Sequence, residues 1–426
     1  MLQPFFYVSN QCQFLSFTSI IKPADLLICV KFLYLHYQRS RIISTHSCNG
    51  LDVGCVITDI NDETIPKKTQ AMKKTFYALM AAGLISVAFA YPLNAANANA
   101  AADGSVAASG TKKDGNVFRN TGNPLVKDNF TADPAPMVYN GRLYLYVGHD
   151  EYYEGQDTAS GGKEFNITEW LCYSTDDMQT WTDHGSVLSP ADFSWAVGEA
   201  WASQVVEKDG KFYYFTTVQA GEPYTGKAVG VAVGDSPTGP FRDAIGKPLV
   251  WDTMTPNGPR GWWNDIDPTV LIDDNGQAWL CWGNGTCFLA KLKPNMTELD
   301  GDIQVINVPK YVEGPWLHKR GDMYYLTYAS DGGDKETISY ATAPAVTGPW
   351  TYRGELTGKA ENSYTIHPGI IEFKGKWYLF YHNAVLTLDG HGGATGRRSV
   401  CVDELHYNDD GTMKPVVQTR RGVSNK

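Results

Sequence analysis

Five stretches of the chain share one pattern of apolar and polar positions. Each begins with a short apolar strand, continues through a turn that contains glycine, and ends in a strand rich in aromatic residues. The stretches are residues 130–150, 201–217, 267–284, 313–330 and 367–383, with turn glycines Gly141, Gly210, Gly276, Gly321 and Gly375. Tight hairpin turns need residues that tolerate positive φ, so each stretch predicts a β-hairpin.

A second pattern follows each of these hairpins. It consists of a strand, a polar turn and another strand, and it occurs at 170–185, 229–243, 287–301, 338–354 and 399–412. Two hairpins make a four-stranded sheet, and five such sheets at spacings of 46 to 68 residues predict an all-β, five-bladed β-propeller. A β-sandwich is the alternative, but a sandwich does not require one unit repeated five times.

The propeller geometry predicts where the candidate functional residues meet. The first strand of every blade lines the central channel, so the residues just before these strands should share one mouth of it. Those positions hold Asp133, Trp201, Asp267, Glu313 and His367. A single acid beside a proline usually caps a turn. Three at equivalent positions favour a functional site, because crowded like charges raise one another's pKa, which a purely structural role would avoid.

Such a set of carboxyl groups suits the hydrolysis of a glycosidic bond. One protonated carboxyl group donates to the leaving oxygen, and an ionised one activates water or attacks the anomeric carbon. A third negative group can keep the pKa of the acid high. Flat aromatic faces suit sugar rings, and the candidates are Trp201, Trp262, Trp263 and Trp316. A non-catalytic sugar-binding propeller is the alternative from another class, but it would not need three clustered acids.

Several motifs occur in the order found in a known family. They are "FTADPAPMVYN", "WASQVV", "NDIDPTV", "YVEGPW" and "HPGIIEFKGKWY". From about residue 121 to 423 the chain resembles glycoside hydrolase family 43. The stretches "MTPNGPRGWWNDIDPTV" and "RRSVCVDELHYNDDGTM" are closer still to its arabinoxylan arabinofuranohydrolases. The resemblance implies an inverting five-bladed propeller enzyme that acts on plant polysaccharides containing arabinose or xylose.

The resemblance also implies roles for the motif residues. Asp133 matches the general base, Glu313 the general acid, and Asp267 the third carboxylate, which tunes the acid and orients the substrate. Trp201 falls at a substrate-stacking position, and Trp316 is a further substrate-binding candidate.

Two more positions carry over from the family. Arg398 matches an arginine near the acid and the sugar, with Arg397 as the competing choice. His367 matches a residue at the channel centre that helps to hold a hydrated calcium ion in several members. The implied chemistry itself needs no cofactor, and a calcium ion in the channel would be structural.

The expected activity is the inverting release of L-arabinofuranose, and also of D-xylose, from arabinoxylan or its oligosaccharides. A β-xylosidase acting on xylo-oligosaccharides is the main alternative, because the two pentoses present similar faces. The loops at 150–168 and 384–397 should decide between them. A retaining fructan-cleaving propeller is a third option, but its usual nucleophile and acid motifs are not visible in the sequence.

The N-terminal region differs in composition from the propeller. Residues 72–100 read as a secretory signal peptide, with Lys73 and Lys74 before an apolar run and then small residues suited to cleavage. We therefore expect export to the periplasm or the medium, with 1–71 an over-extended start and 101–120 a linker before the catalytic domain at 121–426.

Charge and cysteine content limit the partners. The formal net charge is −10, and it becomes −13 without the first 100 residues, which argues against nucleic acid and anionic membranes. No other apolar run has the roughly 18 residues of a membrane span. The four later cysteines are no disulfide framework. Among them, Cys281 and Cys287 either pair across a hairpin or serve as small buried apolar residues.

Overall fold

The computed structural model describes residues 116–255 and 261–425. This part is built almost wholly of strands, with three single-turn 3-10 helices, η2 (Gln156–Thr158), η3 (Pro190–Asp192) and η4 (Gly261–Trp263). No helix in these ranges is long and apolar enough to span a membrane. The expected N-terminal extension, the signal peptide and the linker up to residue 115 lie outside the described residues.

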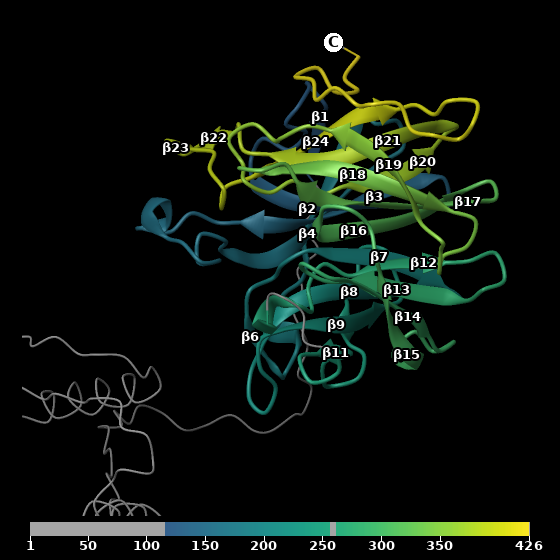
Figure 1. The fold of residues 1–426 in the computed structure, drawn as a ribbon. Helices are drawn as coiled ribbons and strands as arrows, with labels where there is room; N and C mark the ends of the chain where they lie inside the picture. The colour runs from purple at the N-terminus through teal and green to yellow at the C-terminus, as the bar shows by residue number, and fades with distance from the viewer. Residues whose placement is uncertain (1–115, 256–260, 426) are drawn as a thin grey trace, which may run out of the picture. The chain divides into compact units, whose positions relative to one another are not determined.

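The strands form five sheets in chain order (Figure 1). The first blade contains β2 (Phe130–Tyr139), β3 (Arg142–Asp150), β4 (Ile167–Thr175) and β5 (Thr180–Leu188), with β1 (Val117–Arg119) paired to β5. The second contains β6 (Ala196–Gly198), β7 (Ser203–Lys208), β8 (Lys211–Ala220), β9 (Lys227–Gly234), β10 (Arg242–Asp243) and β11 (Val250–Trp251).

The remaining three blades are smaller. The third contains β12 (Thr269–Ile272), β13 (Ala278–Trp282), β14 (Cys287–Leu292) and β15 (Leu299–Ile306). The fourth contains β16 (Tyr311–Arg320), β17 (Met323–Asp331), β18 (Glu336–Ala343) and β19 (Thr351–Thr357). The fifth contains β20 (Gly369–Phe373), β21 (Lys376–Asn383) and β24 (Ser399–Leu405), and the small hairpin of β22 (Thr387–Leu388) and β23 (His391–Gly392) projects from it.

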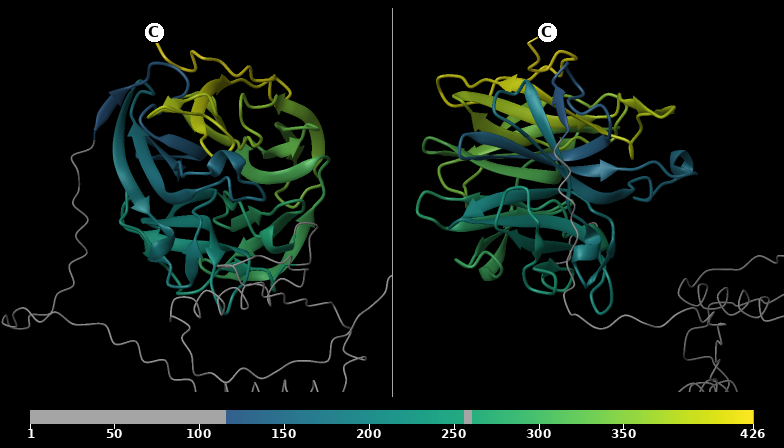
Figure 2. Two further views of the ribbon diagram at one scale, coloured as in Figure 1. Left: turned by 90° about the vertical axis from the view of Figure 1, so that its left-hand side faces the viewer. Right: turned by 180° about the vertical axis from the view of Figure 1, so that it is seen from behind.

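The predicted five-bladed propeller is confirmed. Figure 2 shows the five sheets arranged around a common centre. Their innermost strands form a closed ring, in which β2 lies against β7 and β20, β12 against β7 and β16, and β16 against β20. The predicted tight turns are present as well. At Asn140–Gly141, for example, both residues have positive φ, 50° and 76°, as a type I′ turn requires.

The expectation of four strands in every sheet was wrong for three blades, of which the second has six strands because β6, β10 and β11 join it. The first gains β1, so the propeller begins at Val117, inside the segment expected to be a linker. The fifth has three strands because an N-terminal segment takes the place beside β24. The Leu125 amide donates to the Val400 carbonyl, and the Thr131 amide donates to the Arg398 carbonyl. The two ends of the propeller chain thus close the ring together.

The carboxylates also deviate from their predicted places. Asp133 and Glu313 lie within β2 and β16 rather than just before them, because each strand has a bulge there that shifts its register. The backbone at Asp133 and Asp267 has a φ of 53° and 58°, a conformation that side chains other than glycine rarely adopt. Bulges of this kind re-aim side chains, and here they turn the acids toward the channel mouth.

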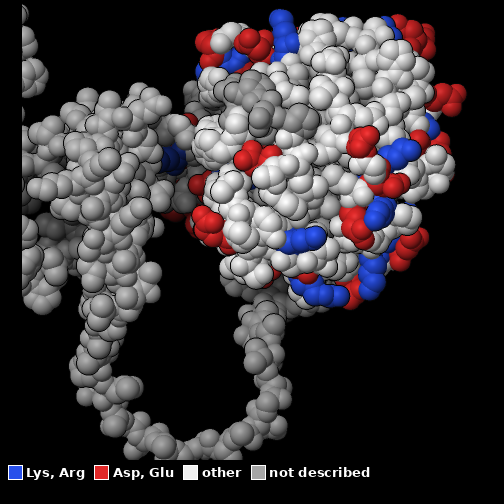
Figure 3. Space-filling model, turned by 60° about the horizontal axis from the view of Figure 1, so that its bottom comes forward, with Lys and Arg blue, Asp and Glu red and all other residues white. Residues whose placement is uncertain are grey.

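Aromatic side chains fill the space between neighbouring blades. Tyr146 of the first blade meets Tyr214 of the second edge to face at 5.5 Å, and both are fully buried. Cys281 and Cys287 are also buried, with their sulfur atoms 3.4 Å apart and unbonded, so the structure favours their role as small apolar residues. On the face shown in Figure 3, positive and negative side chains are interspersed.

Ring closure at Gly369 gives a stability prediction. A Cβ atom there would lie 2.4 Å from the Pro134 carbonyl oxygen, across the junction of the first and last blades. Gly369→Ala should therefore destabilise the protein by about 1–3 kcal/mol in urea unfolding, because rigid backbone must move. Gly358→Ala is the control, since its Cβ would meet only a Glu355 side-chain atom at 3.8 Å. Equal stability of the two variants would contradict the inference that the backbone is tightly packed where the first and last blades meet.

Candidate active site

The structure brings the predicted mouth residues together in one small pocket. Asp133, Trp201, Asp267, Glu313 and His367 all line it, although they come from five blades. The remaining lining residues complete the walls: Phe165, Ile167, Ala202, Trp263, Ile266, Thr365 and Arg398. The spatial convergence that the sequence pattern predicted is therefore present.

His367 lies at the centre of the carboxylates. Its Nδ1 is 3.2 Å from Asp133 Oδ1, its Nε2 is 3.1 Å from Glu313 Oε1, and Nε2 is also 3.9 Å from Asp267 Oδ2. Burial alone would lower the pKa of His367, but the carboxylates outweigh it and raise the pKa to about 10. The imidazole is therefore a cation at neutral pH and balances part of the negative charge.

Asp267 is the most deeply placed of the three acids. Its Oδ2 accepts a hydrogen bond from the Gly314 amide at 2.9 Å, and its own amide donates to Thr217 Oγ1 at 2.8 Å. Burial raises the pKa of Asp267, His367 lowers it, and the two other carboxylates raise it again, to about 7. Asp267 therefore gains or loses its proton near neutral pH, and the neighbouring Glu313 is one of the groups that raise its pKa.

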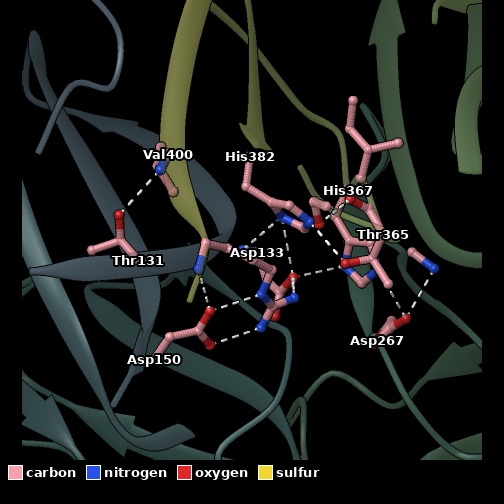
Figure 4. A network of polar contacts seen from close by, with 12 residues as sticks. Thr131, Asp133, Asp150, Asp267, Thr365, His367, His382 and Val400 are labelled. Carbon is pink, nitrogen blue, oxygen red and sulfur yellow. Dashed lines mark hydrogen bonds and ion pairs between the residues drawn. The ribbon is translucent and has the colours of Figure 1, made fainter. Parts of the chain in front are cut away.

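Asp133 is held by an arginine and two histidines. Its Oδ1 accepts a hydrogen bond from Arg398 Nη1 at 2.9 Å, and its amide donates to His382 Nδ1 at 3.3 Å. Figure 4 shows the Asp133 carboxylate between the two imidazoles. Burial and the Arg398 cation keep the pKa of His382 well below its usual value, so His382 is neutral and can accept that bond. The Arg398 guanidinium thus lies directly against the Asp133 carboxylate.

Arg398, rather than Arg397, is the arginine of the site. It is buried against Asp150, which accepts from Nε at 2.9 Å and from Nη2 at 3.0 Å (Figure 4). This two-pronged contact fixes the guanidinium plane, so that Nη1 points at Asp133. Sequence reasoning missed Asp150, although an acid at the end of the first predicted hairpin was a signal for it.

Arg397 has a different place. It joins the two loops expected to shape the pocket, because its guanidinium donates to the Gly392 carbonyl at 2.7 Å, to Gln156 Oε1 at 2.8 Å and to Asp157 Oδ1 at 2.6 Å. The loops at 150–168 and 384–397 therefore act as one rim.

Glu313 has further partners that the sequence did not suggest. Asn284 Nδ2 donates to its Oε2, and it comes from the turn between β13 and β14. A fourth carboxyl group, Glu336, lies buried nearby and accepts from the Ile366 amide at 3.1 Å. Burial and the neighbouring Glu313 raise the pKa of Glu336 well above its usual value. No motif marks either residue.

Trp201 and Trp316 differ in their surroundings. Trp201 lines the pocket, as predicted, whereas Trp316 lies outside it, in a narrow space lined by prolines of the inner strands. The Trp316 indole donates to the Ile370 carbonyl at 2.9 Å and belongs to the main apolar core. This position suits a packing role better than a sugar platform.

Three side chains of the pocket could offer ligand atoms to a metal ion. Asp267, Glu313 and His367 each offer one ligand atom, and these atoms lie within 4.8 Å of one another. The set does not fit direct calcium binding. Calcium takes six to eight oxygen ligands, and a protonated imidazole has no lone pair to donate.

Comparisons with known proteins agree with this geometry. Arabinoxylan arabinofuranohydrolase of Bacillus subtilis is 32% identical over 71% of this chain, and the match covers 65% of that protein. A xylosidase/arabinosidase of Bacteroides ovatus is 33% identical over 68% of this chain and 95% of its own length. This chain thus spans somewhat under two thirds of the first relative and nearly all of the second.

Solved structures give the same result. A β-xylosidase/α-arabinofuranosidase from a compost metagenome, in a calcium-free complex with xylotriose, matches 70% of this chain and 98% of its own, with 28% identity and a TM-score of 0.61. An α-L-arabinofuranosidase of Clostridium thermocellum is 35% identical over 70% of this chain and 97% of its own, with a TM-score of 0.56. The family model for glycosyl hydrolases family 43 matches residues 121–413, and the chain belongs to that family.

Proposed function

We propose that this protein is an inverting glycosidase that removes L-arabinofuranose, and also D-xylose, from arabinoxylan or its oligosaccharides. The observation that carries the proposal is the convergence of Asp133, Asp267 and Glu313 around one buried imidazolium, in a pocket walled by Trp201. The burial of charged side chains is costly, and such clusters occur chiefly at sites that carry out chemistry.

The proposed mechanism is a single displacement. Asp133, which accepts a hydrogen bond from Arg398, takes a proton from a water molecule as the water oxygen attacks the anomeric carbon. Glu313 gives its proton to the glycosidic oxygen as that bond breaks. Asp267 supplies the third carboxyl group, whose Oδ2 lies 3.9 Å from His367 Nε2, the ring nitrogen that also contacts Glu313. The products are the free pentose with inverted anomeric configuration and the shortened polysaccharide.

The position of His367 supports inversion. Its two ring nitrogens contact Asp133 and Glu313, so these carboxyl groups are separated by an imidazole ring and two hydrogen-bond lengths. That arrangement suits the roughly 6.5–9.5 Å of inverting enzymes, which leaves room for a water molecule, better than the roughly 5–5.5 Å of retaining ones.

The substrate assignment rests on the relatives. Proteins similar to this chain are named for arabinoxylan, for xylosidase/arabinosidase activity and for β-xylosidase activity. A β-xylosidase is therefore the second candidate function. The rim joined by Arg397 lies beside the pocket and is the part of the chain that would distinguish the two pentoses.

Replacement of the two central acids tests the mechanism. Asp133→Asn and Glu313→Gln should each lower kcat by about 10²–10⁴-fold on 4-nitrophenyl α-L-arabinofuranoside and β-D-xylopyranoside, because each removes one proton transfer. Asp409→Asn, at an exposed position, is the control. Proton NMR of the first-formed sugar should show inversion. Near-normal turnover by the Asp133 variant would refute the assignment, and release of xylose alone would favour the β-xylosidase.

We further propose that calcium, where it acts on this protein, does so through water and supports structure rather than chemistry. Both nitrogens of His367 face carboxylates, and a calcium ion directly on Glu313 would keep that acid ionised. The His367 cation stabilises the fold below its unfolded pKa of about 6.5. That contribution is lost as the pH rises through its folded value of about 10.

The calcium proposal predicts a dependence on pH. Excess CaCl2 over EDTA should raise the Tm more at pH 10.5 than at pH 6.5, because His367, with a pKa of about 10, has lost most of its proton at the higher pH and repels the ion as a cation at the lower one. The value of kcat at saturating substrate should differ less than about twofold with EDTA, since no proton transfer passes through the ion. Loss of turnover in EDTA, or an equal rise in Tm at both pH values, would contradict the proposal.

We also propose that the protein is exported. The support is the signal-like sequence at 72–100, which lies outside the described residues. Expression of the full gene in a bacterial host should give a secreted or periplasmic protein whose mass corresponds to cleavage after Ala90 or Ala100. A cytoplasmic product that retains Met1 would contradict export.

A further inference from the structure

A buried lysine lies behind the wall of the pocket and has no part in the mechanism above. Lys227 is the first residue of β9, and its side chain is 0% exposed. Its ammonium nitrogen is 3.5 Å from the ring centroid of Trp201 and 5.8 Å from that of Trp262. The Glu199 carboxylate forms an ion pair with it. A buried ammonium group is costly, so its retention beside the pocket calls for a physical reason.

The ring of Trp201 has no polar anchor of its own. The backbone is fixed, because its amide donates to the Thr217 carbonyl at 3.0 Å and its carbonyl accepts from Trp170 Nε1 at 2.8 Å. The indole N–H, however, is buried without a hydrogen-bond partner. Phe165 and Trp263 meet the ring only edge to face, at 6.0 and 5.9 Å. The lysine is thus the charged group that fixes the plane of the ring.

The backbone around the lysine is adapted to this contact. Glu199 has a φ of 60°, which residues other than glycine rarely adopt, and this conformation is found two residues before Trp201. Gly226 precedes the lysine, and a Cβ atom there would lie 2.7 Å from the Trp262 carbonyl oxygen. Burial lowers the pKa of Lys227 to about 6. The Glu199 carboxylate, which forms an ion pair with the lysine, favours the charged form.

We propose that Lys227, paired with Glu199, is a positioning residue that holds the Trp201 indole as a rigid wall of the sugar pocket. The inference rests on the proposed glycosidase function and adds a determinant of substrate affinity to it. A cation over an indole face is attracted by the π electrons, most strongly where water is excluded, as it is here. An ordered ring costs less entropy on sugar binding than a mobile one.

Lys227→Met is the test, because methionine keeps the length and apolar stem and removes the charge. We expect KM for the 4-nitrophenyl pentosides to rise about five- to tenfold, from the loss of one desolvated cation–π contact. The value of kcat should change less than about threefold, since the wall contacts the sugar alike before and during the reaction. A folded variant with unchanged KM would overturn the proposal, as would a fall in kcat alone.

Two variants control for charge and for the fold. Lys227→Arg should restore KM to within about twofold of wild type, because a guanidinium also stacks on indole. Lys291→Met makes the same chemical change at an exposed lysine of β14, 5.4 Å from the Trp279 ring and outside the pocket, and should leave KM unchanged. A rise in KM of equal size in the Lys291 variant would overturn the proposal.

If Lys227→Met fails to fold, Glu199→Gln gives the answer, since this side chain is 44% exposed. It should raise KM in the same direction by about two- to threefold, by loosening the lysine. An unchanged KM in the Glu199→Gln variant would contradict the positioning role of the Lys227–Glu199 pair.

A spectroscopic readout separates this inference from the proposed function. In protein labelled with 5-fluorotryptophan, the ¹⁹F signal lost in Trp201→Phe belongs to Trp201. That signal should shift or broaden in Lys227→Met and not in Lys291→Met, and an unaltered signal would refute the positioning role. Wild-type protein that releases neither pentose would instead refute the proposed function alone.

Discussion

The contact between one protonated imidazole and three carboxyl groups is the interaction on which this site depends. Without the positive charge of His367, Asp133, Asp267 and Glu313 would repel one another in a place that little water reaches. With it, the acids can keep different protonation states at short range. The His367 imidazolium therefore balances negative charge in this pocket, as a bound metal cation would. Arg398 supplies a second positive charge beside Asp133.

The propeller makes that contact possible because five inner strands meet at one channel. The acids nevertheless need more than blade symmetry. Bulges in β2 and β16 and the unusual backbone of Asp133 and Asp267 aim the side chains inward. Backbone conformations of this kind are unfavourable and persist only where the surroundings enforce them. In this fold the enforcement comes from tightly packed neighbouring strands, as the close approach of Gly369 to Pro134 shows.

Much of this arrangement was predictable from the sequence, because the repeated hairpin pattern places equivalent residues at equivalent positions. The residues that escaped prediction have no such repeat. Asp150, Asn284 and Lys227 act through side-chain contacts between segments distant in the chain, which periodicity does not encode. Trp316 is the opposite case, since it stands within the YVEGPW motif and its side chain belongs to the apolar core. The fifth blade has three strands instead of the expected four, because the segment that lies beside β24 comes from the start of the domain, near residue 125.

That shared last blade has a consequence for how the molecule assembles. Residues near 125 hydrogen-bond with residues near 400, so the toroid cannot be sealed until the strand near residue 400 has been synthesised. Contacts between such distant positions slow folding, because a long loop must close before they form. A chain of this design therefore stays an open row of blades during its synthesis, and the first blade lacks its neighbour in the ring until the last blade forms.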